Sequence, residues 1–237
     1  MDEWETELLR YKNMLDSFQK WEPDLAAFVR RLPNIPLNYA PTSEGIVALQ
    51  VSLFVVAGCL PVSSQAVAAF QNLWQARLLN IISLPARLIY ELWGGVHYAR
   101  HILIQMRKSS DVSVALLKSQ RLVTGVHSQV ELPWGGTSTD KCINVMEFVR
   151  SLSNVYPETE DSYAFLCESC HPSFLRHSTW SLACPPQPNW SNPKFREHAH
   201  LVICRTLEII ERSLGGIASD SRETLEVALP FIERDYL

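Results

Sequence analysis

The sequence is poor in glycine and contains none of the common catalytic sequence motifs. Nine glycines in 237 residues leave little material for a glycine-rich loop that cradles phosphate groups. The chain has no GxSxG, HExxH, Walker A or GxGxxG pattern. These absences argue against an α/β-hydrolase, a zinc metalloprotease of the HExxH type, a P-loop nucleotidase and a dinucleotide-binding domain.

Charge is also scarce. Charged residues make up 19% of the chain, the net charge is −4, and no dense run of lysine and arginine occurs. Bulk electrostatics therefore do not support non-specific binding to duplex nucleic acid, although a local groove can still be basic. Hydrophobic residues make up 47% of the chain and include seven tryptophans. This composition argues against disorder and predicts a folded protein with a substantial core.

Neither a secretory signal nor a membrane span is expected. The N-terminus, MDEWETELL, is acidic where a signal peptide needs positive charge. The most apolar stretch, Ile46 to Leu60, is followed by Pro61 and falls short of the roughly 20 residues that cross a bilayer. Six cysteines without a secretion signal indicate reduced thiols. We therefore expect a cytoplasmic protein that is not inserted in a membrane.

Apolar residues recur at helical spacing through most of the chain, and no segment shows clear strand alternation. The pattern predicts an all-α fold of about nine or ten helices in a single domain. In this domain, N-terminal helices in 1–60 pack on a core of 63–213, and a C-terminal helix covers 219–237. Gly215 and Gly216 are expected to end one helix, and Asp220 or Ser221 to cap the next.

Two segments are expected to be irregular. Residues 129–138 have the composition of a loop, and residues 172–193 hold five prolines. Long irregular segments inside compact domains often bind substrates or partners.

The first candidate site is a polar stripe on the apolar helix predicted for 86–106. Arg87, Glu91, Gly94, Tyr98 and His101 share one face of this helix. Polar groups on a buried helix need partners or a cavity. The stripe therefore predicts either a site, with Arg87 and Glu91 as catalytic groups and Tyr98 and His101 binding substrate, or an internal ion pair that fixes the helix register.

The second candidate is a group of cysteines and histidines. Cys167-x-x-Cys170-His171 matches the attachment motif of a c-type haem, but that chemistry requires export, so no covalent haem is expected and no cofactor is assigned. Cys167, Cys170, His177 and Cys184 have the ligand types of a zinc site without the usual paired spacing. The alternative is that Cys167 and Cys170 are small buried residues on one helix face.

The third candidate is Arg121 followed by His127, the spacing of the catalytic motif of HEPN ribonucleases. In such a pair the histidine transfers protons and the arginine neutralises the phosphate. Leu122 stands where that family usually has a polar residue, and one such match is expected by chance in a chain of this composition. A structural or surface role for both residues is the alternative.

Two of these patterns together resemble a known family. Arg87-x-x-x-Glu91 amid apolar residues, followed by Tyr163-x-x-Leu166-Cys167-x-x-x-His171-Pro172, is similar to a group of bacterial all-helical proteins known as a domain of unknown function. Some members of that group are thought to be distantly related to HEPN and abortive-infection proteins. The resemblance implies a helical core in which Arg87, Glu91, Tyr163 and His171 approach one another, with Tyr163 and His171 as further site residues.

Three functional hypotheses follow. The first is a bacterial, HEPN-like protein that acts on RNA, with a role in phage defence or in a toxin system. The second is a protein-interaction or homodimerisation module that uses the tryptophan-containing segments 132–136 and 185–192. The third is a helical protein that binds a small ligand or a metal.

Overall fold

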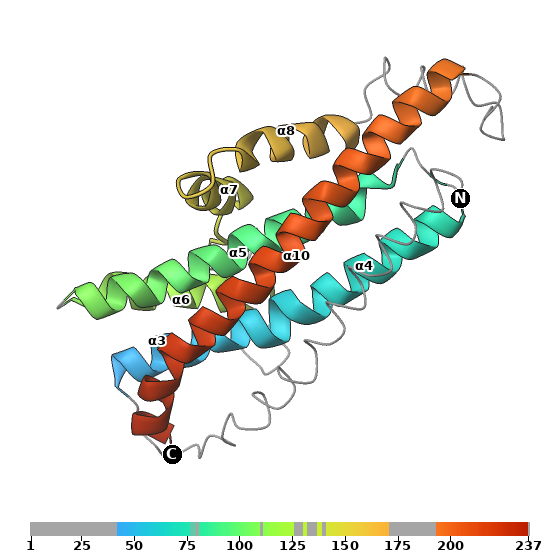
Figure 1. Cartoon of the computed structure of the whole chain (residues 1–237). Helices are drawn as coiled ribbons and strands as arrows, with labels where there is room; N and C mark the ends of the chain where they lie inside the picture. The colour runs from blue at the N-terminus through green and yellow to red at the C-terminus, as the bar shows by residue number, and fades with distance from the viewer. Residues whose placement is uncertain are drawn as a thin grey trace.

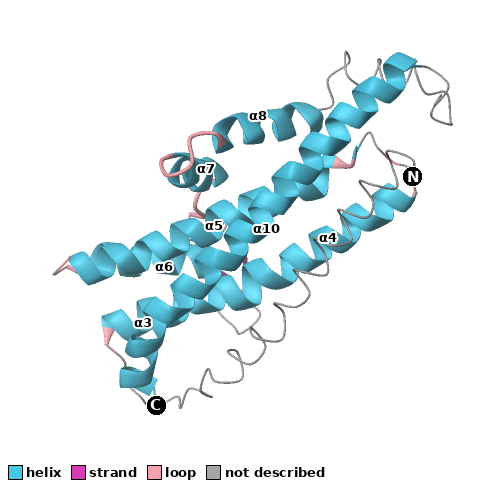
Figure 2. Ribbon diagram, viewed as in Figure 1, coloured by secondary structure: helices cyan, strands magenta, loops and turns pink. Residues whose placement is uncertain are grey.

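The computed structural model describes residues 42–76, 78, 81–109, 111–125, 130–131, 137–138, 141–170 and 193–236. Helices dominate this part of the chain (Figure 2), as the all-α prediction requires. The elements are α3 (Ser43–Leu53), a π-helical segment η1 (Phe54–Cys59), α4 (Leu60–Gln75), α5 (Ser83–Lys108), α6 (Ser113–Thr124), α7 (Val145–Ser153), α8 (Thr159–Cys170) and α10 (Pro193–Tyr236). The two-residue strands β1 (Val130–Glu131) and β2 (Thr137–Ser138) pair antiparallel.

Helix α5 is the centre of the fold. It packs against α10, α4, α7, α8, α6 and α3. Figure 1 shows α7 and α8 on one side of α5, the rod formed by α3, η1 and α4 on the other, and α10 crossing the length of the molecule. Most of the α5 side chains are buried, including Ile89, Tyr90 and Leu103 at 1% exposure or less. An apolar helix that is contacted on several sides is the expected core of such a bundle.

The helix that begins at Ser43 does not end at Pro61, contrary to the sequence-based expectation. It continues through η1 into α4, and Pro61 lies in the first turn of α4. A proline at that position costs little, because the π-helical turn before it already changes the backbone hydrogen-bond register. The run Ser43–Gln75 is 33 residues long and apolar enough to cross a membrane by length and composition, and half of its most apolar window is buried inside the protein.

Gly215 and Gly216 do not end a helix either. Helix α10 runs unbroken for 44 residues through both glycines and through Pro230. Gly216 is required for packing, because a Cβ placed there would lie 2.1 Å from Cε2 of Trp93. Asp220 is therefore not a helix cap but a buried residue in the middle of α10.

These fusions change the helix count. The N-terminal part (1–60) and the core (63–213), which were expected to be separate, are joined by the continuous rod Ser43–Gln75. The helix expected to end at Gly215 and the one expected at 219–237 are a single helix. Nine or ten helices are therefore not supported in the part of the chain that the structure describes. The part of the expected N-terminal helices that precedes residue 42 lies outside the described residues.

The start of α3 is tied to the end of α10. Thr42 is the N-cap of α3 and accepts a hydrogen bond from the Gly45 amide at 3.1 Å. Asp235 of α10 accepts from the backbone amide of Thr42 at 3.0 Å and also from its hydroxyl. Arg234 pairs with Glu44 at 3.0 Å. These contacts fix the first turn of α3 against the last turn of α10.

The adjacent glycines provide a matched test of the α5–α10 contact. We expect Gly216→Ala to lower the free energy of unfolding by about 1–3 kcal/mol, because its methyl group overlaps the Trp93 ring. Gly215→Ala should raise it by about 0.5–1 kcal/mol, since no atom lies within 4 Å of its Cβ and alanine favours the helix. Urea denaturation followed by circular dichroism measures both. Equal effects of the two substitutions would contradict the packing role of Gly216.

Candidate functional site

The polar stripe predicted on α5 is present, and α8 covers its first end. The Arg87 Nε donates to Glu91 Oε1 at 2.8 Å, and the Tyr163 hydroxyl of α8 donates to the same oxygen at 3.0 Å. A second nitrogen of Arg87 lies 3.3 Å from the Tyr163 hydroxyl oxygen. Arg87, Glu91 and Tyr163 therefore meet, as the family resemblance implies, while His171 lies outside the described residues.

The electrostatics of this cluster favour a structural role, in which the cluster holds α8 against α5. The ion pair with Glu91 raises the pKa of Arg87, and burial together with Glu91 raises the pKa of Tyr163. Tyr163 therefore stays protonated and acts as a hydrogen-bond donor at neutral pH. Burial raises the pKa of Cys170 to about 11, which makes its thiol a poor nucleophile.

Aromatic packing holds the same interface from the other side. The rings of Tyr90 and Tyr163 stack with centroids 5.4 Å apart, and the Tyr90 hydroxyl donates to the Thr159 carbonyl at 2.8 Å. The side chains of Arg87 and Glu91 are 34% and 23% exposed, so solvent reaches the edge of the cluster but not its interior.

The middle of the stripe is closed by α7. A Cβ on Gly94 would lie 3.1 Å from the backbone of Phe148, so the absence of a side chain at Gly94 allows α7 to pack directly on α5. Arg87 and His101 lie about 21 Å apart along the helix, at about 1.5 Å per residue. No small ligand can contact both ends. The polar stripe, which lies on one face of the helix in the sequence, is therefore divided by α7 into two separate polar regions in the structure.

The second end of the stripe opens into a cleft of about 400 Å³ between α5, α6 and α7. Both residues predicted to bind substrate, Tyr98 and His101, line it. The cations Lys118 of α6 and Arg150 of α7 line it as well. Its other lining residues are Ile102, Gln105, Glu147, Ser151, Asn154 and Val155. This volume lies within the range of ligand-binding pockets, about 300–1,000 Å³.

The cleft side chains are positioned by contacts with one another. The rings of Tyr98 and Phe148 have centroids 5.5 Å apart. The Lys118 ammonium lies 5.9 Å from the Tyr98 ring and donates to Gln105 at 3.2 Å. Burial, followed by the neighbouring His97, lowers the pKa of His101, so its imidazole is neutral at pH 7. The cleft thus combines aromatic surface, the two cations Lys118 and Arg150, the carboxylate of Glu147 and a neutral imidazole.

Sequence reasoning missed a buried polar network centred on Asp220. Its Oδ2 accepts from Trp93 Nε1 at 3.1 Å and lies 3.0 Å from His97 Nδ1, and its Oδ1 accepts from Arg100 at 3.1 Å. His97 is 1% exposed, and its Nε2 has no hydrogen-bond partner among the described residues. The spacing of Trp93, His97 and Arg100 places them on one face of a helix and could be read from the sequence. Their partner Asp220 could not, because the helix was expected to end at Gly215 and Asp220 to cap the next one.

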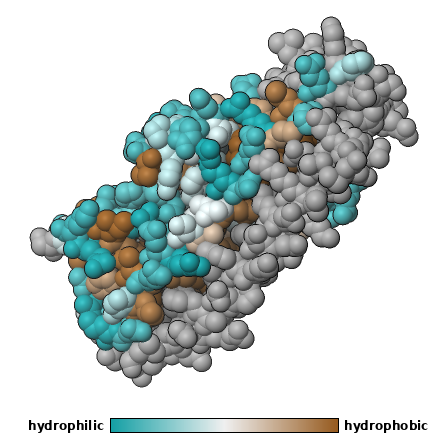
Figure 3. Space-filling view, in the orientation of Figure 1, coloured by the Kyte–Doolittle hydropathy of each residue, from teal (hydrophilic) through white to brown (hydrophobic). Residues whose placement is uncertain are grey.

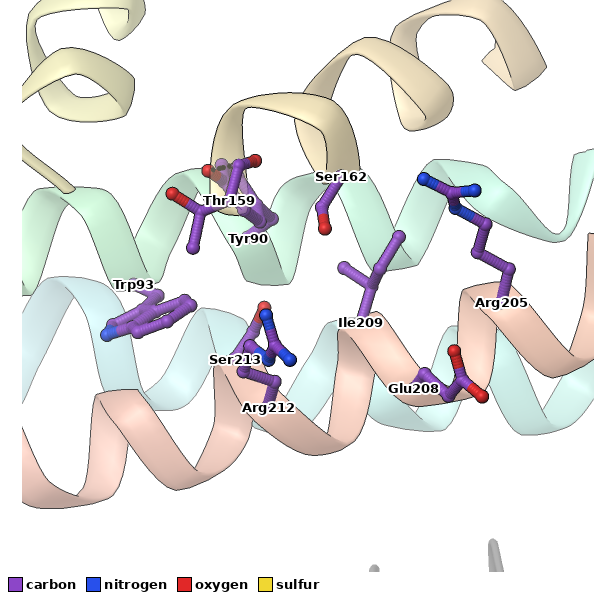
Figure 4. Close-up of a pocket in the computed structure, with 9 residues that line it drawn as sticks. All are labelled: Tyr90, Trp93, Thr159, Ser162, Arg205, Glu208, Ile209, Arg212 and Ser213. Atoms are coloured by element: carbon purple, nitrogen blue, oxygen red, sulfur yellow. Dashed lines mark hydrogen bonds between the residues drawn. The ribbon is translucent and has the colours of Figure 1, made fainter. Parts of the chain in front are cut away.

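A second, smaller cleft of about 150 Å³ lies between α5, α8 and α10 (Figure 4). Arg205 and Arg212 line it together with Ser162 and the buried Ser213. The charges there are balanced, because Arg212 pairs with Glu158 at 3.3 Å and Glu208 lines the same cleft. This cleft is too small for a typical ligand and has no marked preference for an anion.

The remaining predicted residues do not form a site in the described structure. The Arg121 guanidinium donates to the carbonyls of Lys141 and Cys142 at 2.9 and 3.3 Å, which anchors the start of the segment before α7. His127 lies outside the described residues. Cys167 and Cys170 are free thiols on α8, and His177 and Cys184 also lie outside the described part. No group of three or more metal-ligating residues occurs within that part.

The comparisons do not assign the chain to a family. Protein-family models, curated proteins and solved structures all give no match. The fold defines the class as all-α, and any further functional statement depends on the geometry of the clefts.

The Asp220 network has a direct test. Asp220→Asn removes the buried carboxylate that Trp93, His97 and Arg100 share and leaves Arg100 paired with Glu223. We therefore expect the free energy of unfolding to fall by about 1–3 kcal/mol. Glu223→Gln is the matched control, since Glu223 also pairs with Arg100, at 2.5 Å, but is 45% exposed. We expect that change to cost at most about 1 kcal/mol. Chemical denaturation of both variants measures the difference, and similar costs would refute the central role of Asp220.

Proposed function

We propose that this protein is an RNA-binding helical protein of HEPN-like type, and that single-stranded RNA binds in the cleft between α5, α6 and α7. The observation that carries the proposal is the combination of Tyr98, His101, Lys118 and Arg150 around one cleft of about 400 Å³. Single-stranded nucleic acid is typically held by aromatic rings that stack on bases and by cations that contact phosphates.

Each type of contact has a candidate residue. Tyr98 and His101 offer rings on which a base can stack, and Gln105 and Asn154 offer amides that can hydrogen-bond to base edges. Lys118 and Arg150 lie on different helices and can contact successive phosphates. The net charge of −4 does not conflict with this proposal, because a local groove rather than the whole surface provides the positive charge.

The described residues offer no free arginine among the predicted catalytic groups for a reaction on RNA. The pair Arg121 and His127 is the sequence candidate for ribonuclease chemistry, but the guanidinium of Arg121 is engaged with two backbone carbonyls. Arg87 is likewise engaged with Glu91 and Tyr163. The proposal therefore concerns binding, with Lys118 and Arg150 as the phosphate contacts.

The alternative of an interaction module is not favoured by the described face shown in Figure 3. On the face shown in Figure 3, hydrophobic residues lie in separate groups among hydrophilic ones rather than in one continuous patch. Interaction surfaces are usually larger contiguous apolar patches. The tryptophan-containing segments 132–136 and 185–192 lie outside the described residues.

Fluorescence anisotropy with a labelled single-stranded RNA tests the proposal. We expect binding that weakens as salt rises, because phosphate contacts release counterions. Arg150→Ala should lower the affinity by about tenfold, the loss of one charge-assisted contact. It should also reduce the slope of log affinity against log salt by about 0.7, the value for one phosphate contact to a single strand.

The control is Arg222→Ala, which removes an exposed arginine of α10 that does not line the cleft. This variant should bind RNA like the unmodified protein. If Arg150→Ala and Arg222→Ala weaken binding equally, the cleft is not the RNA site. If the unmodified protein does not bind single-stranded RNA at low salt, the proposed function is wrong.

A further inference from the structure

His97 and His101 form a pair of imidazoles in ring contact on α5. They are four residues apart on α5 and therefore project from the same face, one turn from each other. Their rings meet at an interplanar angle of 72°, with centroids 5.0 Å apart. His97 is buried, whereas His101 is half-buried and lines the cleft between α5, α6 and α7.

The protonation pattern leaves one nitrogen of His97 available. A carboxylate only accepts hydrogen bonds, so the contact of 3.0 Å to Asp220 Oδ2 places the proton of a neutral His97 on Nδ1. Its Nε2 then carries a free lone pair. That nitrogen is buried and has no hydrogen-bond partner among the described residues. A buried acceptor without a partner costs free energy, so a ligand for it would explain the arrangement.

We propose that His97 and His101 bind a divalent transition metal ion of the zinc class through their imidazole nitrogens, at the inner edge of the cleft. Two histidines at this spacing on a helix are the ligand pair of many zinc sites. Asp220 then has the role of the carboxylate that orients a metal-ligating histidine through its other nitrogen. Imidazole favours zinc, copper and nickel over magnesium and calcium.

The residues around His97 and His101 determine how many protein ligands the proposed metal site has. Within the described residues no third histidine, cysteine or acidic group joins the pair. Two protein ligands are fewer than the three of typical catalytic zinc sites, so water that enters beside His101, which lines the cleft, completes the coordination. His101 is the ligand that can reorient, because it borders the cleft. Arg100 is the nearby cation, and it is paired with Asp220 and Glu223.

Isothermal titration calorimetry with zinc chloride, in the absence of RNA, tests this proposal independently of the proposed function. We expect one zinc ion to bind per chain at this site. His101→Ala should weaken that binding more than tenfold, because it removes one of the two proposed protein ligands, and loss of an orienting residue alone typically costs about 10- to 100-fold. Circular dichroism should show the same helix content for the variant, since His101 is only half-buried.

Two controls separate this pair from other thiol and imidazole groups. His200→Ala removes a histidine of α10 that lies 3.5 Å from the Cys204 sulfur, and it should leave zinc binding unchanged. Cys167→Ala should also leave it unchanged. The proposal fails if the unmodified protein binds no zinc, if His101→Ala binds zinc with unaltered affinity, or if Cys167→Ala abolishes the binding.

Discussion

The buried carboxylate of Asp220 is the constraint on which the arrangement of the helices depends. It accepts hydrogen bonds from Trp93 and Arg100 and contacts His97, all on one face of α5. A charge at 3% exposure is tolerated only when it is paired. This requirement fixes the register of α10 on α5, and Gly216 makes the close approach of Trp93 sterically possible. The smaller cleft, between α5, α8 and α10, depends on that register.

Much of the fold could be predicted from the sequence, because helical periodicity is a local property. The helix predicted for 86–106 is present as α5, and the pairing of Arg87 with Glu91 followed from their spacing of four residues. The unbroken α10 could not be predicted in this way. Two adjacent glycines usually end a helix, and only the distant ring of Trp93 reveals why one of them is there. Tertiary packing overrides local propensity at this point.

The candidate site was predicted in parts but not as a whole. The sequence identified Tyr98 and His101, whereas Lys118 and Arg150 come from helices whose placement only the fold shows. The division of the polar stripe by Phe148 could not be predicted either, because nothing in the sequence around Gly94 indicates that another helix packs there. The first half of the stripe thus contacts α8, and the second half lines the cleft between α5, α6 and α7.

The central claim is that α5 and α10 form one cooperative unit around Asp220, with α10 continuous through its two glycines. Amide hydrogen exchange tests it most directly. The account predicts that the amides from Gly216 to Thr224 in α10 and from Trp93 to Arg100 in α5 are among the slowest to exchange and do so with similar free energies of opening. Fast exchange confined to Gly215–Asp220, as at a break between two helices, would contradict it.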